Sequence, residues 1–136
     1  MNLELLKQEL VRDEGERLKP YHCTAGKLTI GVGRNLDDVG LSADESAYLL
    51  GNDIVRVMAE LDKALPWWRG LSEVRQRALA NMAFNLGVPR LKGFARMLAA
   101  LQAGQWEEAA KQALASKWAV QVGDRAKRIA KMIKEG

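Results

Sequence analysis

The stretch EGERLKPYHCTAGKLTIGVG, residues 14 to 33, decides how this sequence is interpreted. It opens with a carboxylate beside a glycine, Glu14-Gly15, and closes in a run that alternates apolar and small residues. Between them lie the only cysteine, Cys23, and a threonine, Thr29. Either these three side chains form one chemical site, or they are a helix-end acid, a buried thiol and an ordinary strand residue.

The residues before this stretch predict a helix. Leu3, Leu6 and Leu10 recur at three- and four-residue spacing, which indicates an amphipathic helix over residues 2–14 that ends at the following glycine. Glu14 continues the apolar stripe, so we expect its carboxyl to be partly desolvated.

Desolvation and the negative end of the helix dipole would both raise the pKa of the Glu14 carboxyl. A carboxyl that stays protonated can act as a general acid. The alternative is a solvated residue at a helix end, with Glu16 as its exposed counterpart. Spacing alone favours the solvated residue.

The stretch itself predicts a β-hairpin over residues 17–33, with a turn around residues 24–26. Leu28, Ile30 and Val32 would share one face of the second strand. Thr29 would lie on the other face, which is turned outward or into a cleft. Cys23 next to the only histidine, His22, makes a poor nucleophilic pair, because neighbouring strand residues point to opposite faces.

The rest of the chain predicts helices. Ser42 and Glu45 form a capping box for a long helix that ends before Pro66. Its predicted buried positions are Leu50, Ile54, Val57, Met58, Leu61 and Leu65. Further apolar stripes predict helices over residues 72–86, 91–101 and 106–114, and Asp124 is predicted to cap the last helix.

Length and charge set broad limits. A chain of 136 residues fits one domain, or two lobes around a cleft. Its net charge of +4 suits an anionic polymer, either nucleic acid or a cell wall. The sequence shows neither the apolar core of a signal peptide nor a run long enough for a membrane span, so we expect synthesis in the cytoplasm and no stable membrane insertion.

Glu14, eight residues, Cys23, five residues and Thr29, closed by TIGVG, resembles the catalytic signature of phage T4-type lysozymes, the endolysins of glycoside hydrolase family 24. That signature is Glu, eight residues, Asp or Cys, five residues, Thr. Later segments are also similar to the family and occur in its order, so the resemblance covers nearly the whole chain. These segments are residues 77–87, Gly93-Phe94, residues 106–110, Lys117-Trp118 and residues 125–128.

The resemblance implies a muramidase that hydrolyses the β-1,4 bond between N-acetylmuramic acid and N-acetylglucosamine in peptidoglycan. It implies that Glu14 protonates the leaving oxygen and that Thr29 holds the catalytic water. Arg125 matches an arginine that pairs with the catalytic Glu, and this pairing would lower the pKa of the acid. Phe84 matches an aromatic residue on the substrate side. No cofactor and no metal are implied.

Two departures from the family matter. Cys23 stands where the usual residue is an aspartate, and a thiol is mostly neutral at neutral pH. Cys23 could be a base helped by a nearby cation, an orienter of water, or a nucleophile that forms a thioglycosyl intermediate. Arg34 stands where the family often has a histidine, and Asp53 matches that histidine's acidic partner. We therefore predict an Arg34–Asp53 pair.

The fold class expected is α+β and mainly α: a lysozyme-like two-lobe fold with a small N-terminal β-hairpin lobe, a long connecting helix and a helical C-terminal lobe. Residues 1–136 would form one catalytic domain. Lobe 1 would cover about 13–50, and lobe 2 about 66–136 plus the N-terminal helix.

The expected function is that of a phage endolysin, a bacteriolytic hydrolase that degrades the host cell wall. We expect a monomer whose partner is bacterial peptidoglycan and not nucleic acid. It would reach the wall from the host cytoplasm through a separate holin. Two alternatives are a lytic transglycosylase that cuts the same bond without water, and a basic wall- or nucleic-acid-binding module without catalysis.

Overall fold

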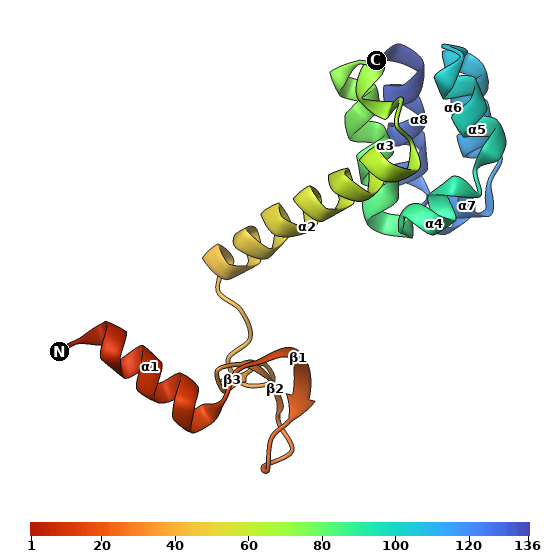
Figure 1. The fold of residues 1–136 in the computed structure, drawn as a ribbon. Helices are drawn as coiled ribbons and strands as arrows, with labels where there is room; N and C mark the ends of the chain where they lie inside the picture. Colours follow the sequence, from red (N-terminus) through yellow and green to blue (C-terminus); the bar gives the residue numbers. More distant parts are fainter. The chain divides into compact units, whose positions relative to one another are not determined.

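The computed structural model describes residues 1–136, which form two compact units, Met1–Tyr48 and Leu49–Gly136. The first holds one whole helix, a small sheet and the start of a long helix, and the second is helical (Figure 1). The expected fold class, α+β and mainly α with a small N-terminal sheet, is confirmed. The division into lobes at about 13–50 and 66–136, with the N-terminal helix in the second lobe, stays a prediction.

The first unit begins with α1, Leu3–Glu14, as the leucine spacing predicts. The side chain of Asn2 accepts a hydrogen bond from the Leu5 N–H at 3.1 Å and so caps the first turn. Gly15 ends the helix with a φ of 76°, a conformation that glycine adopts without steric cost.

A three-stranded antiparallel sheet follows, in the order β1-β2-β3. Its strands are β1 (Arg17–His22), β2 (Leu28–Gly31) and β3 (Arg34–Asn35). The predicted second strand continued to residue 33, but the chain turns at Val32–Gly33 and comes back as a short third strand. The predicted hairpin is therefore present and is extended by one strand.

The long helix α2, Ala43–Ala64, begins with the predicted capping box. The Ser42 N–H donates to Glu45 Oε1 at 2.8 Å, and the Glu45 N–H donates to Ser42 Oγ at 3.1 Å. Of the predicted buried positions, Val57, Leu61 and Leu65 are buried and Met58 is partly buried. Leu50 and Ile54 were predicted wrongly, because their side chains remain 49% and 43% exposed.

The second unit contains one 3-10 turn and six helices after α2. They are η1 (Trp68–Gly70), α3 (Glu73–Leu86), α4 (Val88–Lys92), α5 (Ala95–Gln102), α6 (Trp106–Leu114), α7 (Lys117–Val122) and α8 (Asp124–Glu135).

Two details of these helices differ from the prediction. The helix predicted over 91–101 is two helices, α4 and α5, because the chain leaves the helical path at Phe94, which has a ψ of 54°. Asp124 is the first residue of α8 and not its cap, since that place belongs to Gly123, which has a φ of 56°.

The core lies inside this helical unit. Helices α6 and α8 lie side by side; α5 packs on α6, and α3 packs on α8 (Figure 1). The largest fully buried side chains are Trp68, Leu61, Leu79, Met82, Leu91, Met97, Leu101 and Ile133. Arg75 ties α3 to the end of α8, where its Nε donates to the Ile133 carbonyl at 2.7 Å.

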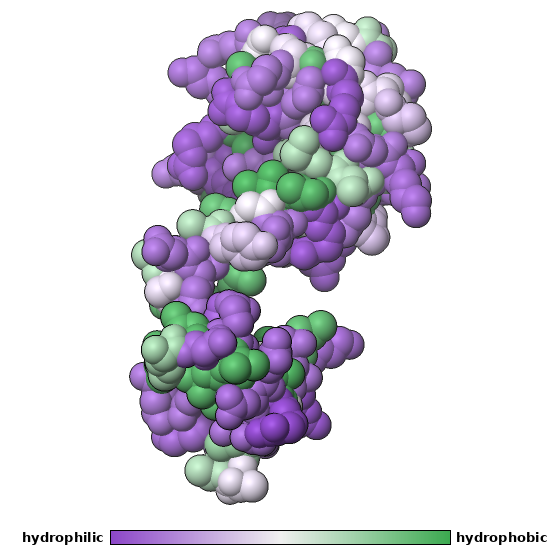
Figure 2. Space-filling model, turned by 60° about the vertical axis from the view of Figure 1, so that its left-hand side comes forward, coloured by the Kyte–Doolittle hydropathy of each residue, from purple (hydrophilic) through white to green (hydrophobic).

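The surface is mostly hydrophilic, but apolar patches, drawn in green in Figure 2, interrupt it in both units. The exposed apolar side chains include Leu3 and Leu10 on α1 and Phe84 on α3. None of the helices combines the length and the apolar character that crossing a membrane requires.

Candidate active site

Glu14 is the last residue of α1, and the sheet register decides what it lies beside. Arg17 in β1 pairs with Gly31 in β2, so the residues just before Arg17 run alongside the turn just after Gly31. As a result, the Glu14 Oε2 atom lies 3.4 Å from the position that a Cβ on Gly33 would occupy. The carboxyl of the predicted acid thus lies beside Gly33, at van der Waals distance from the place where a side chain there would begin.

Cys23 lies at the turn between β1 and β2. The Gly26 N–H donates to the Cys23 carbonyl at 2.8 Å, and the Cys23 N–H donates to the Lys27 carbonyl at 2.9 Å. Gly26 has a φ of 79°, which closes the predicted turn around residues 24–26. The turn thereby holds the thiol beside the start of β2.

Thr29 and Cys23 come together at this turn. The Thr29 hydroxyl donates to the Lys27 carbonyl at 2.9 Å and also lies within hydrogen-bonding reach of the Cys23 sulfur. Hydrogen bonds from the backbone N–H groups of Lys27 and Ala25 lower the pKa of the Cys23 thiol, and the Thr29 hydroxyl adds to that effect. The turn therefore stabilises the thiolate relative to that of an ordinary cysteine.

A hydroxyl carries only one proton, so Thr29 has two arrangements. While it donates to Lys27, its lone pairs can accept a hydrogen from a thiol or from water. When the Cys23 sulfur is ionised, the hydroxyl can rotate and donate to the sulfur. Thr29 is thus able to follow the protonation state of its neighbour.

Two expectations about exposure need correction. Thr29 was predicted to face outward or into a cleft, but it is 4% exposed and is the most buried residue of the sheet, because its hydroxyl is directed at backbone and thiol. Glu14 was predicted to be partly desolvated, yet it is exposed, since the leucine stripe it continues is itself exposed.

The predicted Arg34–Asp53 pair is not present. Arg34 Nη1 donates to Glu45 Oε1 and Arg34 Nη2 lies near Glu45 Oε2, both at 2.7 Å. Asp53 instead accepts from Arg56 Nη1 at 3.0 Å, one helical turn along α2. Glu45 stands in the first turn of α2, just after the loop that follows β3, and this loop brings it within reach of Arg34.

In the second unit, Phe84 and Arg125 line the same apolar hollow, which has a volume of about 460 Å³. Arg125 Nε and Nη2 both donate to Asn81 Oδ1, at 3.0 and 2.8 Å. Asn81 therefore fixes the guanidinium beside the 45% exposed ring of Phe84. The predicted pairing of Arg125 with Glu14 stays a prediction.

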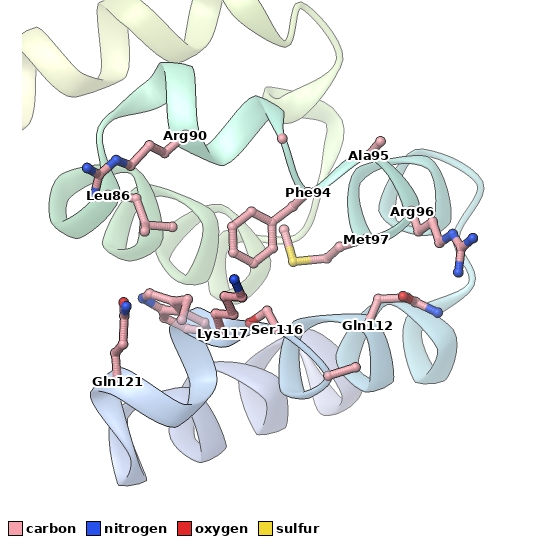
Figure 3. A pocket seen from close by; sticks show the side chains of 13 residues that line it. Leu86, Arg90, Phe94, Ala95, Arg96, Met97, Gln112, Ser116, Lys117 and Gln121 are labelled. Atoms are coloured by element: carbon pink, nitrogen blue, oxygen red, sulfur yellow. The ribbon is translucent and has the colours of Figure 1, made fainter.

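A larger hollow of about 600 Å³ opens among α4, α5, α6 and α7 (Figure 3). Phe94 and Met97 point into it, while Arg90 and Arg96 lie at opposite ends of the view. Its cationic lining residues are Arg90, Arg96 and Lys117, and no acidic side chain lines it. The hollow suits a ligand that carries negative charge.

Two partners of predicted site residues, Glu45 for Arg34 and Asn81 for Arg125, do not follow from the order of residues. Glu45 was recognised only as a helix cap, and nothing in its spacing ties it to Arg34. Asn81 lies forty-four residues from Arg125, so only folding reveals their contact. The acid-free segment between Glu73 and Glu107 was the available signal for the cationic hollow.

The sequence of the chain matches a known protein family. The family described as "Phage lysozyme" matches residues 11–133, a range that contains Glu14, Cys23, Thr29 and both hollows. The chain belongs to the phage lysozyme family. The predicted family is thereby confirmed.

Three relatives are similar to the chain in sequence. It is 31% identical to the pre-baseplate central spike protein Gp5 of Enterobacteria phage T4, with 96% of this chain and 28% of that protein aligned. It is 27% identical to probable T4-type lysozyme 1 of Dictyostelium discoideum, with 96% and 94% aligned. It is 33% identical to an endolysin of Acyrthosiphon pisum secondary endosymbiont phage 1, with 57% and 53% aligned.

These relatives differ in length. The chain spans under a third of the spike protein and nearly the whole of the Dictyostelium lysozyme. Its similarity to the spike protein is therefore a similarity to one part of a longer chain.

Proposed function

We propose that this chain is an endolysin that hydrolyses the β-1,4 bond between N-acetylmuramic acid and N-acetylglucosamine in peptidoglycan. Its place in the phage lysozyme family supports this function. The observation that carries the proposed mechanism is the meeting of Cys23 and Thr29 at one turn, in the same compact unit as Glu14.

In the proposed reaction the protonated Glu14 carboxyl donates its proton to the glycosidic oxygen as the bond breaks. The Thr29 hydroxyl orients a water molecule, and the Cys23 thiolate accepts a proton from that water as it attacks the sugar carbon. The hydrogen bonds that lower the pKa of Cys23 make the thiolate available for this step.

The same thiolate could instead attack the sugar carbon directly and form a thioglycosyl intermediate. The two routes give opposite stereochemistry at the sugar carbon. Proton NMR of the freshly released sugar distinguishes them, since inversion fits Cys23 as base and retention fits Cys23 as nucleophile.

A lytic transglycosylase would cut the same bond without water. Hydrolysis is favoured here because Thr29 and Cys23 offer a polar pair that can hold and activate a water molecule. Mass spectrometry of digested walls tests the choice. Reducing N-acetylmuramic ends are expected, and anhydro-muramic ends would contradict a hydrolase.

Substrate contacts are proposed in the second unit. Phe84 offers an exposed ring for stacking on a sugar, and Arg125, held by Asn81, offers hydrogen-bond donors beside it. The cationic hollow around Lys117 offers room for the carboxylates of the wall peptides. Peptidoglycan is the partner to which this surface is complementary.

Other parts of the expected biology stay predictions: action from the host cytoplasm, release through a separate holin, and a monomeric state. Membership in the phage lysozyme family does not favour a nucleic-acid-binding module or a wall-binding protein without catalysis. DNA binding without wall clearing would revive those alternatives.

The decisive experiment replaces the proposed acid. Glu14→Gln removes the transferable proton and keeps the shape, so the rate of wall clearing should fall by about 10²-fold or more. Glu16→Gln is the matched control, because Glu16 is a similarly exposed carboxylate two residues away. It should change the rate by less than about twofold. Unchanged activity of Glu14→Gln would contradict the proposed role of Glu14 as the general acid.

A further inference from the structure

The Glu14 carboxyl depends on the turn that joins β2 to β3. Gly33 in this turn has a φ of 68° and presents only backbone to Glu14 Oε2. The side chain of an exposed glutamate has several rotamers of similar energy, so an adjacent wall restricts where its carboxyl lies. The position of the turn therefore influences the position of the carboxyl.

The strands alone hold this turn weakly. β3 contains only Arg34 and Asn35, which pair with Ile30 and Thr29 of β2. Two residue pairs at the edge of a small sheet are a marginal anchor. A second anchor is needed if the turn is to keep one position.

Arg34 supplies that anchor directly after Gly33. Its guanidinium meets both carboxylate oxygens of Glu45 at 2.7 Å, and Nη1 also donates to the Gly40 carbonyl at 3.1 Å. Such a two-point contact fixes direction as well as distance. Both side chains remain a little over one third exposed, so the contact is a partly solvated one.

Glu45 is itself fixed at the start of α2. The Ser42 N–H donates to Glu45 Oε1 at 2.8 Å, so the capping box and the Arg34 pair share one carboxylate. The Arg34 guanidinium and the Ser42 hydrogen bonds lower the pKa of Glu45 to about 2. The pair therefore stays charged in neutral and mildly acidic solution.

We propose that the Arg34–Glu45 pair is a positioning device for Glu14. The pair holds the β2–β3 turn against the first turn of α2, and Gly33 in that turn sets where the Glu14 carboxyl lies. Arg34 and Glu45 act through the turn and not on the reacting atoms. This inference rests on the proposed function, in which Glu14 is the general acid.

The kinetic test uses Glu45→Gln in the full chain. Glutamine is accepted in capping boxes, so the start of α2 is kept while the charged two-point contact is lost. With soluble peptidoglycan fragments as substrate, kcat should fall about tenfold and KM should change less than about twofold, since only the acid is displaced. Arg34→Lys keeps the positive charge but loses the planar guanidinium that makes two contacts. Its kcat should lie between those of the parent and of Glu45→Gln.

A matched control is found in the second unit. Arg69 and Asp62 form a comparable two-point pair, with Nε donating to Oδ1 at 2.7 Å and Nη2 donating to Oδ2 at 3.1 Å. Asp62→Asn should leave kcat within about twofold of the parent, because this pair does not touch the β2–β3 turn. An equal loss in Asp62→Asn would overturn the proposal.

A second measurement does not need catalysis. In ¹⁵N-resolved NMR, the amide of Gly33 should shift as Glu14 titrates, and Glu14→Gln should abolish that part of the shift. Glu45→Gln should reduce the shift by about half or more, because the distance between the Gly33 amide and the Glu14 carboxyl is then no longer fixed.

The outcomes are separable. The positioning role is overturned if Glu45→Gln leaves kcat unchanged, or if it leaves the pH-dependent shift of the Gly33 amide unchanged. This holds even if Glu14→Gln is inactive. An active Glu14→Gln overturns the proposed function instead, and the Gly33 titration then still reports whether the pair positions the carboxyl.

Discussion

Cys23 stands at the position where the signature that this chain resembles usually has an aspartate. A free thiol is mostly neutral at neutral pH. At this turn, backbone N–H groups of Lys27 and Ala25 and the hydroxyl of Thr29 surround the sulfur and lower the pKa of the thiol. In the proposed mechanism, this backbone helps the thiol to serve in place of a carboxylate, because it stabilises the ionised sulfur.

This environment predicts opposite results for two substitutions of Cys23. Cys23→Asp places a carboxylate among the same donors and should keep wall clearing within about tenfold of the parent. Cys23→Ser introduces a hydroxyl that does not ionise, and the rate should fall by about 10²-fold. Clearing of purified walls measures both.

Thiol alkylation provides the control for these variants. It should inactivate the parent and leave Cys23→Asp unaffected, because Cys23 is the only cysteine. Full activity of Cys23→Ser would exclude both the base role and the nucleophile role, and would leave Cys23 as a structural neighbour of Thr29.

At the scale of elements, the short strand β3 and the helix α2 are joined through Arg34 and Glu45. The capping box at Ser42 could be read from sequence because its residues are three apart. The partner of Arg34 could not be predicted in the same way. Glu45 and Asp53 both lie on the predicted helix, and their spacing does not show which of them pairs with Arg34. The loop after β3 decides the choice.

The Arg34–Glu45 pair should make stability depend on pH. The pKa of Glu45 in the folded chain, about 2, lies well below the ordinary value of about 4.5 for a glutamate carboxyl. The ionised carboxylate therefore stabilises the folded chain fully above about 4.5, and this contribution declines as the pH falls and is lost below about 2.

Thermal unfolding of the parent and of Glu45→Gln tests this dependence. The variant should melt at a lower temperature at neutral pH, and the difference should disappear near pH 2 as the parent's carboxylate becomes protonated. Asp44→Asn, in the same turn of α2, is the control and should show a smaller difference. A difference that persists unchanged in acid would contradict the assignment to the Glu45 charge.

At the scale of the whole molecule, charge is divided unequally between the two units. Residues 49–136 carry fifteen Lys and Arg against eight Asp and Glu, whereas residues 1–48 carry six against nine. The overall net charge of +4 conceals this division. The positive unit contains the cationic hollow, so wall binding should depend on that unit.

Two double substitutions test the division, and they change the net charge equally. Arg96→Gln with Lys117→Gln removes cations from the hollow, and binding to purified walls should weaken about threefold or more at low salt. Lys7→Gln with Lys19→Gln in the first unit should weaken it by less than about twofold. Sedimentation of walls with bound protein measures both.

Salt separates electrostatic binding from other causes. The difference between the two variants should shrink at high ionic strength, because screening weakens charge contacts beyond the Debye length. Equal weakening by both variants would mean that net charge alone governs wall binding and that the hollow has no special role.

Sequence by itself determined much of this protein. The leucine spacing of α1, the turn before β2, the capping box of α2 and the stripe of α3 are local patterns, and local patterns can be read from the order of residues. The signature of Glu14, Cys23 and Thr29 also indicated the family, which the match over residues 11–133 confirms.

Tertiary structure decided the rest, because it depends on residues far apart in the chain. In the folded chain Thr29 is buried, whereas Leu50 and Ile54 are exposed. The helix predicted over 91–101 is divided into two, and Arg34 pairs with Glu45. Tertiary structure also placed Glu14 against Gly33, nineteen residues later in the sequence. Such contacts follow from strand register and loop path, and spacing along the chain encodes neither.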